Sequence, residues 1–369
     1  MQGGAALKYS RNPLVLSGMV IGAIAIALQR LGNPPNMGIC VACMIRDISG
    51  ALGLHRASTV QYIRPEIIGL VLGSTISAAA NGEFHARGGS APLIRFFLGF
   101  FAMVGALVFL GCPWRAILRL AGGDANAVLG LAGLISGIWV GVGFLKAGYT
   151  LGRSHRNEPG SGLVMPALMV VLLLLAVFAP QMGTADGART GPVFASLKGP
   201  GSQHAPLLAS LVGGLIVGVL AQRTRFCTVG ALRDLILIRD FHLFSGIIAF
   251  FSTALFLNLV LGQFRWGFVG QPIAHSSQLW NFAGMALAGL AFTLAGGCPG
   301  RQLIMSGEGD ADAGIFVLGM LAGAGFSHNM SMAGSPAGPG AFSQIGVLVG
   351  LAFCLVLGYY MRRTDLGVN

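Results

Sequence analysis

Long apolar stretches alternate with short polar segments along the 369 residues of this chain. Each stretch is about 17 to 22 residues long, the length that an α-helix needs to cross the hydrocarbon core of a bilayer. The pattern therefore predicts an all-α polytopic membrane protein with about ten transmembrane spans. The predicted spans are residues 13–31, 64–80, 93–111, 126–147, 162–180, 205–222, 242–262, 278–296, 313–330 and 341–361.

Four further segments are too short or too charged to cross a bilayer, yet too apolar for ordinary loops. Irregular or broken backbone is tolerated at membrane depth only where it is buried in protein or lines a cavity. We therefore expect re-entrant half-helices, meaning short helices that enter the membrane without crossing it. These segments are residues 36–53, 112–120, 226–240 and 298–306.

Two motifs occur twice at nearly the same spacing. Residues 111–127, GCPWRAILRLAGGDANA, align without gaps on residues 297–313, GCPGRQLIMSGEGDADA, with eight of 17 positions identical and an offset of 186. Cys40 and Cys227, which are 187 residues apart, each precede an Arg-Asp pair with five residues between. Two independent motifs with one period indicate a duplicated unit.

Each copy of the unit contains about five spans, and an odd number places the two copies upside down relative to each other, as in many transporters. We therefore expect an inverted repeat of two homologous halves. The predicted divisions are residues 1–160 for the N-terminal repeat, 161–204 for a connecting span and loop, and 205–369 for the C-terminal repeat.

The composition agrees with a membrane protein and excludes several other classes. Only 9% of the residues are charged and 54% are hydrophobic, whereas soluble domains have about 25% charged residues. The formal net charge is +11, but the arginines are spread along the chain, so we expect no nucleic-acid partner. In a bilayer protein such a charge reflects the basic bias of cytoplasmic loops, or cations that serve an anionic substrate.

The GCP motifs predict a thiol at the start of a half-helix. In each motif an apolar run ends at Gly, Cys112 or Cys298 follows, and Pro then takes the first helical position, where its missing N–H costs nothing. A helix N-terminus offers unpaired N–H groups and a partial positive charge, which attract anions. Arg115 and Arg301, three residues further on, each add a fixed cation.

Cys40 and Cys227 are expected in the first turn of the other two half-helices. Four thiols at four broken-helix ends, related in pairs by an inverted axis, would converge near the membrane midplane and line a substrate path. The alternative is that each cysteine is a small core residue. We accept that alternative for Cys354, whereas packing alone does not explain why the other positions are duplicated.

Several further polar residues are secondary candidates. Cys43 forms a Cys-x-x-Cys spacing with Cys40, but no second pair or nearby His completes a metal site, and we expect neither a metal nor a cofactor. Asp124 and Asp310 precede long apolar runs, which favours helix N-caps. The alternative is an ion pair with Arg115 or Arg301.

Two other groups of charges leave their roles open. Glu308 and Asp312 make the second copy more acidic than the first. The pairs Arg46-Asp47 and Arg233-Asp234 are either structural ion pairs that neutralise themselves or functional groups in the membrane.

Paired GCP-x-R motifs followed by D-A-x-A, together with the C-x5-R-D half-helices, resemble the YeeE/YedE family of bacterial membrane proteins. The resemblance covers nearly the whole chain, and the details of residues 111–127 and 297–313 are closer to the selenium-associated YedE branch than to the thiosulfate-importing YeeE branch. It implies an inner-membrane protein with an inverted-repeat, hourglass fold and re-entrant helices. It also assigns the constricted path to Cys40, Cys112 and Cys298, with Cys227 as the additional counterpart.

The residues and the resemblance together predict a transporter or channel for a small inorganic sulfur or selenium species, and not an enzyme. One alternative is a membrane thiol enzyme that forms a persulfide or selenosulfide on a path cysteine. Another is a protein that delivers sulfur or selenium to a cytosolic carrier. The expected partners are the substrate, the lipid bilayer and such a carrier protein. No nucleotide-binding loop is present, so ATP-driven transport by this chain alone is not expected.

Overall fold

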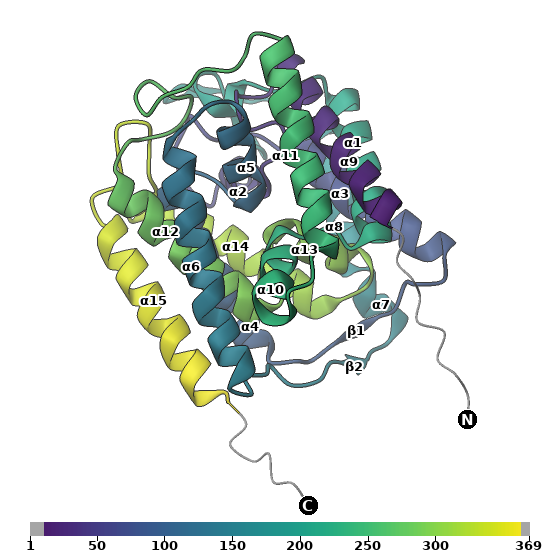
Figure 1. Ribbon diagram of the computed structural model, residues 1–369. Helices are drawn as coiled ribbons and strands as arrows, with labels where there is room; N and C mark the ends of the chain where they lie inside the picture. The colour runs from purple at the N-terminus through teal and green to yellow at the C-terminus, as the bar shows by residue number, and fades with distance from the viewer. Residues whose placement is uncertain (1–10, 363–369) are drawn as a thin grey trace, which may run out of the picture.

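The computed structural model describes residues 11–362 of the chain (Figure 1). Within this part nearly all of the regular secondary structure is α-helical, and the strands are only two or three residues long. The prediction of an all-α polytopic membrane protein is confirmed.

Ten long apolar helices match the ten predicted spans one for one. Eight of them are long and apolar enough to cross a membrane. In this count α4, α9 and α12 are each taken together with the half-helix that follows. The other two, α3 and α8, are shorter. The helices are α1 (Arg11–Arg30), α3 (Pro65–Ala80), α4 (Pro92–Phe109), α6 (Asn126–Lys146), α8 (Val164–Phe178), α9 (Leu207–Thr224), α11 (His242–Val260), α12 (Gln278–Ala295), α14 (Ala311–Asn329) and α15 (Ser343–Tyr360).

Four half-helices stand where the sequence predicts them: α2 (Val41–Ala51), α5 (Pro113–Ala121), α10 (Thr228–Ile238) and α13 (Pro299–Gly307). At nine or 11 residues, and a rise of about 1.5 Å per residue, none reaches across a bilayer. In three cases a left-handed residue ends the preceding long helix: Leu110 with φ 64°, Arg225 with φ 54° and Gly296 with φ 91°. The chain thereby breaks two residues before Cys112, Cys227 and Cys298.

The helix contacts come in matched pairs. α6 packs on α12 as α14 packs on α4, and α3 packs on α9 as α11 packs on α1. Small residues allow these close approaches, because a Cβ on Gly105 would lie 2.4 Å from the carbonyl oxygen of Gly284 and one on Gly137 would lie 2.0 Å from that of Ala286. Figure 1 shows α2 and α5 in the upper half of the molecule, and α10 and α13 in the lower half.

The ends of α5 and α13 are held in the same way. Each is followed by a left-handed glycine, Gly123 with φ 92° and Gly309 with φ 96°. The carbonyl oxygen of Gly123 accepts the N–H of Gly267 at 3.0 Å, and that of Gly309 accepts the N–H of Arg87 at 3.2 Å. A Cβ on either glycine would lie under 3.0 Å from the backbone of the opposing loop. Only glycine fits both the conformation and the space.

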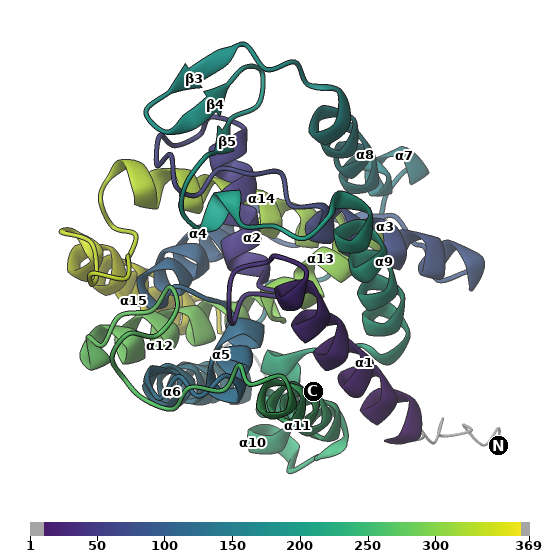
Figure 2. The same cartoon turned by 90° about the horizontal axis from the view of Figure 1, so that it is seen from above.

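Much of the segment between α6 and α9 lies beside α2. It contains the short helix α7 (Pro159–Gly162), α8, the antiparallel strands β3 (Gly183–Ala185), β4 (Ala188–Thr190) and β5 (Ala195–Ser196), and the 3-10 helix η1 (Pro200–Ser202). Figure 2 shows this small sheet at the edge of the helix bundle. It is joined to the chain around α2 by the bond from Phe194 N–H to the carbonyl oxygen of Ala51, at 2.9 Å. A second pair of strands, β1 (Arg87–Gly88) and β2 (His155–Arg156), lies on the opposite side (Figure 1).

Candidate functional site

The structure brings the four predicted path cysteines together as two pairs, all with buried side chains. In the first pair, formed by α2 and α5, the sulfur atoms of Cys40 and Cys112 are 3.8 Å apart. In the second, formed by α10 and α13, the Cys227 sulfur accepts the Cys298 backbone N–H at 3.4 Å. These groups are called the N-terminal thiol pair and the C-terminal thiol pair below.

Each of the four cysteines is the N-cap residue of its half-helix. A capping side chain normally offers an oxygen atom to the N–H groups that the first turn leaves unpaired. Here sulfur takes that place in three of the four caps, and in the fourth the Cys112 thiol faces Cys40. The capping bonds run from Cys43 N to Cys40 Sγ (3.4 Å), from Gly230 N to Cys227 Sγ (3.2 Å) and from Arg301 N to Cys298 Sγ (3.5 Å).

Two buried aromatic residues lie where the thiol pairs approach each other. Trp114, two residues after Cys112, has its ring centre 5.8 Å from that of Phe226, which directly precedes Cys227. A Cβ on Gly300 would lie 2.7 Å from the Trp114 indole. Trp114 therefore contacts both half-helix starts of the C-terminal thiol pair. Sequence analysis missed this residue, although the aligned motifs carry Trp in one copy and Gly in the other.

The two predicted arginines differ in their partners. Arg301 forms a two-pronged ion pair with Glu308, with N–O distances of 2.9 and 3.3 Å. Arg115 instead donates to the Cys43 sulfur at 3.3 Å and to the backbone carbonyls of Asn36, Ile273 and Leu110. Within the described part of the chain, Arg115 makes no ion pair with a carboxylate. Its charge is therefore balanced only by carbonyl dipoles and a sulfur atom.

The alternative interpretation of Asp124 and Asp310, an ion pair with Arg115 or Arg301, is wrong. Asp124 pairs with Arg119 at 2.6 Å, because the turn at Gly123 folds its carboxylate back onto the last turn of α5, whereas Arg115 stands at the start of that helix. Asp310 pairs at 2.8 Å with Arg87, which arrives from the distant β1.

The favoured N-cap interpretation is confirmed for Asp310, which accepts the Ala313 N–H at 3.1 Å at the start of α14. Asp124 accepts the Asn126 N–H at 3.0 Å at the start of α6, where Ala125 holds the cap position. Asp312 also has a structural role, since its carboxylate accepts the backbone N–H groups of Gly89 and Ser90.

The Arg-Asp pairs of α2 and α10 bond within themselves. Arg46 contacts Asp47 at 2.7 Å, and Arg233 contacts Asp234 at 2.8 Å. In the buried pair, Arg64 adds a second contact to Asp47 at 2.7 Å. No sequence motif pointed to Arg64, since it lies in the loop before α3.

A cavity of about 350 Å³ reaches the C-terminal thiol pair. Its wall contains Cys227 and three arginines, and the larger residues Cys43 and Leu110 stand at the positions of the first repeat that correspond to Gly230 and Gly296 of this wall. The lining residues are Thr224, Arg225, Cys227, Gly230, Arg233, Asp234, His242, Leu243, Gly296 and Arg301.

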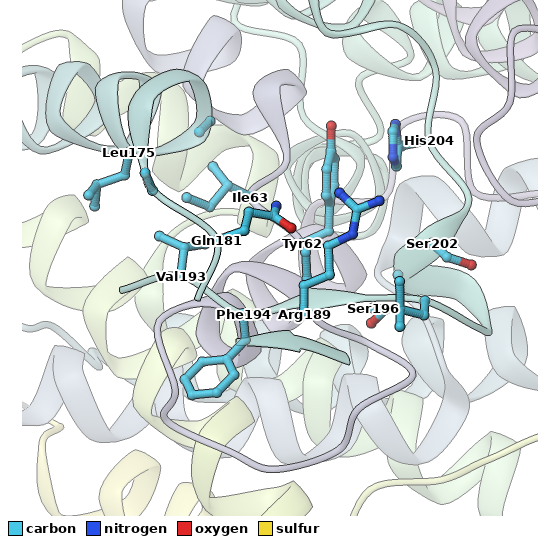
Figure 3. Close-up of a pocket in the computed structure, with 15 residues that line it drawn as sticks. Tyr62, Ile63, Leu175, Gln181, Arg189, Val193, Phe194, Ser196, Ser202 and His204 are labelled. Atoms are coloured by element: carbon cyan, nitrogen blue, oxygen red, sulfur yellow. The ribbon is translucent and has the colours of Figure 1, made fainter. Parts of the chain in front are cut away.

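A second cavity, of about 400 Å³, lies under the small sheet on the α2 side (Figure 3). Tyr62 and His204 stack at 4.2 Å between ring centres and lie with Arg189 at one end, away from the apolar Ile63. Burial raises the pKa of Tyr62 to about 12 and lowers the pKa of His204, so both groups are neutral at pH 7. Sequence analysis interpreted this segment only as a connection.

A third cavity, of about 240 Å³, lies beside Arg115. Asn36, whose carbonyl oxygen accepts from the Arg115 guanidinium, lines it together with Arg265 and Gly122. Cationic side chains thus flank hollows on both sides of the two thiol pairs. Among the described residues no cluster of His, Cys, Asp and Glu is arranged to hold a metal ion.

Two comparisons with known proteins bear on this site. Residues 223–356 match the family model described as Sulphur transport. The chain is also 32% identical, over 99 residues, to the thiosulfate transporter TsuA of Spirochaeta thermophila, an alignment that covers 27% of this chain and 29% of TsuA. The chain thus spans under a third of the length of the curated relative that it matches.

The segment that matches the family contains Cys227, Cys298, Arg301 and Glu308, and ends before α15 does. Both comparisons are with transport proteins, and they support the resemblance to the YeeE/YedE family without separating its selenium branch from its thiosulfate branch. Over α10 to α14 and much of α15, this membrane protein is similar to the sulphur transport family.

Proposed function

We propose that this protein carries a small inorganic sulfur anion of the thiosulfate type across the bacterial inner membrane. The observation that carries the proposal is the pairing of buried thiols at four half-helix N-termini, with a cavity that reaches Cys227. Helix N-termini favour anions through their N–H groups and partial positive charge. The similarity to transport proteins favours passage over thiol enzymology.

The arginines of the cavity would draw the anion in. Arg225, Arg233 and Arg301 line it, and Asp234 is the one carboxylate among its lining residues. A concave surface of one predominant charge raises the local concentration of an oppositely charged solute. Electrostatic attraction at the cavity would therefore precede contact with the thiols.

The thiol pairs would provide successive weak sites. A thiol is a weak hydrogen-bond donor, so it solvates a soft sulfur atom without holding it tightly. Conduction requires binding that is favourable enough for entry and weak enough for release. In this proposal the anion exchanges between the C-terminal thiol pair, Cys227 and Cys298, and the N-terminal pair, Cys40 and Cys112.

The proposal includes an inverted repeat that places the two thiol pairs back to back. The repeats are residues 1–160 and 205–369, joined by residues 161–204. The matched contacts of α6 with α12 and of α14 with α4 support this division, as do the matched bonds at Gly123 and Gly309.

Uptake into liposomes tests the function. The purified protein would be reconstituted and supplied with thiosulfate, selenite or sulfate, alongside a Cys298→Ser variant and a Cys354→Ala control. Serine is a good N-cap, so C298S keeps the fold but loses the soft donor, and we expect thiosulfate uptake to fall at least about tenfold. C354A, which changes a buried residue of α15, should transport normally.

The outcomes separate the candidate functions. Uptake of selenite instead of thiosulfate would assign the protein to selenium transport. If the folded protein moves none of the three anions, the transport proposal is wrong. Recovery of substrate mass bound covalently to Cys298 during turnover would then indicate the thiol enzyme or the delivery protein.

A further inference from the structure

The indole N–H of Trp114 is a buried donor without an acceptor. The side chain is 1% exposed, and Nε1 has no hydrogen-bond partner among the residues that the structure describes. Buried Trp N–H groups usually find a partner, and leaving a buried donor unpaired costs free energy. An unpaired donor of this kind therefore calls for an explanation.

The indole of Trp114 packs against the first turn of α13, in the C-terminal thiol pair. A Cβ on Gly300 would lie 2.7 Å from Cζ2 of Trp114, 2.9 Å from Cη2 and 3.1 Å from Cε2, the carbon bonded to Nε1. Gly300 is two residues after Cys298, in the first turn of α13. Trp114 itself is two residues after Cys112, in the first turn of α5. The indole that carries the unpaired N–H therefore lies between the first turn of α5 and that of α13, beside Phe226, the residue before Cys227.

The two copies of the motif are complementary at this position. The alignment of residues 111–127 with 297–313 places Trp114 opposite Gly300. A side chain at Gly300 would collide with the indole, so a single indole occupies the space between the half-helices. A second unpaired polar atom lies close by in sequence, the hydroxyl oxygen of Thr228, which directly follows Cys227 and is 1% exposed.

We propose that the Trp114 indole N–H binds an oxygen atom of the anion as it crosses between the two thiol pairs. This inference rests on the proposed function and deepens it. A neutral donor holds an oxyanion less tightly than Arg, which suits a site that must release its ligand. The indole also fills the gap between the half-helices, which makes Trp114 a residue that determines specificity.

The arrangement selects an anion with two different ends. The thiols offer soft contacts, which suit a terminal sulfur atom, while the indole N–H and the Thr228 hydroxyl are donors for oxygen. Thiosulfate carries both kinds of atom, whereas sulfate has oxygen atoms only. The inference therefore assigns the substrate class as oxyanions that bear a terminal sulfur.

Trp114→Phe is the sharpest test, because phenylalanine keeps a ring against Phe226 and Gly300 but lacks the N–H. We expect its KM for thiosulfate uptake to rise by about tenfold or more, the effect of removing one hydrogen bond to a charged group. Trp139→Phe is the matched control, since Trp139 is 67% exposed on α6, and its KM should not change. An unchanged KM in W114F, with wild-type uptake intact, would overturn the inference.

A second measurement does not depend on how W114F folds. The chain has four tryptophans, so a variant with Trp139, Trp266 and Trp280 replaced by Phe retains one indole signal in a ¹⁵N NMR spectrum. Saturating thiosulfate should move the Trp114 N–H proton resonance downfield, and equal sulfate should not. The absence of any shift, in protein that still takes up thiosulfate, contradicts the inference. If wild-type protein takes up no thiosulfate, the proposed function itself fails.

Discussion

Sulfur atoms occupy N-cap positions that usually carry Ser, Thr, Asp or Asn. The N–H groups of Gly230 and Arg301 lie 3.2 and 3.5 Å from the capping sulfur atoms, and because sulfur is a weak acceptor these bonds are weaker than bonds to an oxygen cap. Helix ends that are loosely satisfied in this way retain binding capacity for a passing anion. The caps Cys112 and Cys298 could be predicted from the sequence, because Gly marks the end of one helix and Pro the first position of the next. Cys40 and Cys227 were predicted in the first turn and lie one position earlier, at the N-cap.

Local sequence patterns could not predict ion-pair partners that come from distant segments of the chain. Asp310 pairs with Arg87, 223 positions away in the chain, and Arg64 reaches Asp47 from a loop without a motif. Each of these ion pairs forms because the tertiary fold brings a cation close to the carboxylate, and the spacing of residues along the chain does not show where that happens. The same reason applies to Trp114, whose role depends on the space left by Gly300 in the other copy.

His55 predicts a pH dependence of stability. It lies in the loop after α2, where its Nε2 contacts the carbonyl oxygen of Arg46 at 3.1 Å and its Nδ1 accepts the Ala57 N–H. Burial lowers the pKa of His55, and the neighbouring Arg46 cation lowers it further, although the hydrogen bond and Asp47 act in the opposite direction. The folded protein therefore binds this proton less readily than the unfolded chain does.

This difference in proton affinity determines how the stability changes with pH. Stability is fully present above the ordinary histidine pKa of about 6.5 and is lost as the pH falls below it, because the unfolded state then takes up more protons. We expect the melting temperature in detergent to decrease from pH 7.5 to pH 5.5. His55→Gln should reduce this decrease, whereas replacement of the exposed His85 by Gln should leave it unchanged. If the melting temperature of H55Q decreases with pH as steeply as that of the wild type, the prediction is wrong.

At the scale of elements, hydrophobic length and small-residue patterns predict both the ten spans and the four half-helices. The predicted helix ends agree closely with those in the structure, because a cap, a Pro or a left-handed residue marks them, as at Cys298 and Gly296. The small sheet of β3 to β5 was not predicted, since its strands are two or three residues long and lie in a segment rich in Gly, Pro and Ser. Strands that short depend on tertiary contacts for their existence.

The glycine turns after α5 and α13 are sensitive points of the element packing, because each combines a left-handed conformation with a close backbone neighbour. Gly123→Ala places a Cβ at 2.6 Å from the backbone of Arg265, in a left-handed conformation that alanine rarely adopts. We expect a loss of about 1 to 3 kcal/mol in stability, read as a lower melting temperature in detergent. Gly143→Ala is the control, because a Cβ there meets no atom within 4 Å and α6 gains helix propensity. Equal melting temperatures for the two variants would show that the turn tolerates a side chain.

At the scale of the whole molecule, the two thiol pairs are similar in construction but unequal in access. Cys227 borders a cavity of about 350 Å³, whereas Cys40 is completely buried. The difference arises from Cys43 and Leu110, which are larger than their counterparts Gly230 and Gly296. Arg115 adds to the closure by binding the Cys43 sulfur. In the described arrangement Cys227 borders a cavity, whereas neither Cys40 nor Cys112 lines any of the three cavities described above.

This asymmetry predicts unequal thiol reactivity. Wild-type protein in liposomes would be treated briefly with a small charged methanethiosulfonate reagent, and the modified peptides would be counted by mass spectrometry. With an anionic reagent, Cys227 should react fastest among the six cysteines, because the arginines of the cavity attract the reagent toward it, while Cys40 and the buried Cys354 serve as internal controls. Thiosulfate should slow the reaction at Cys227 by occupying the same space. Labelling of Cys40 as fast as Cys227 would mean that the N-terminal thiol pair is equally open, and that the filling by Cys43 and Leu110 does not close the path.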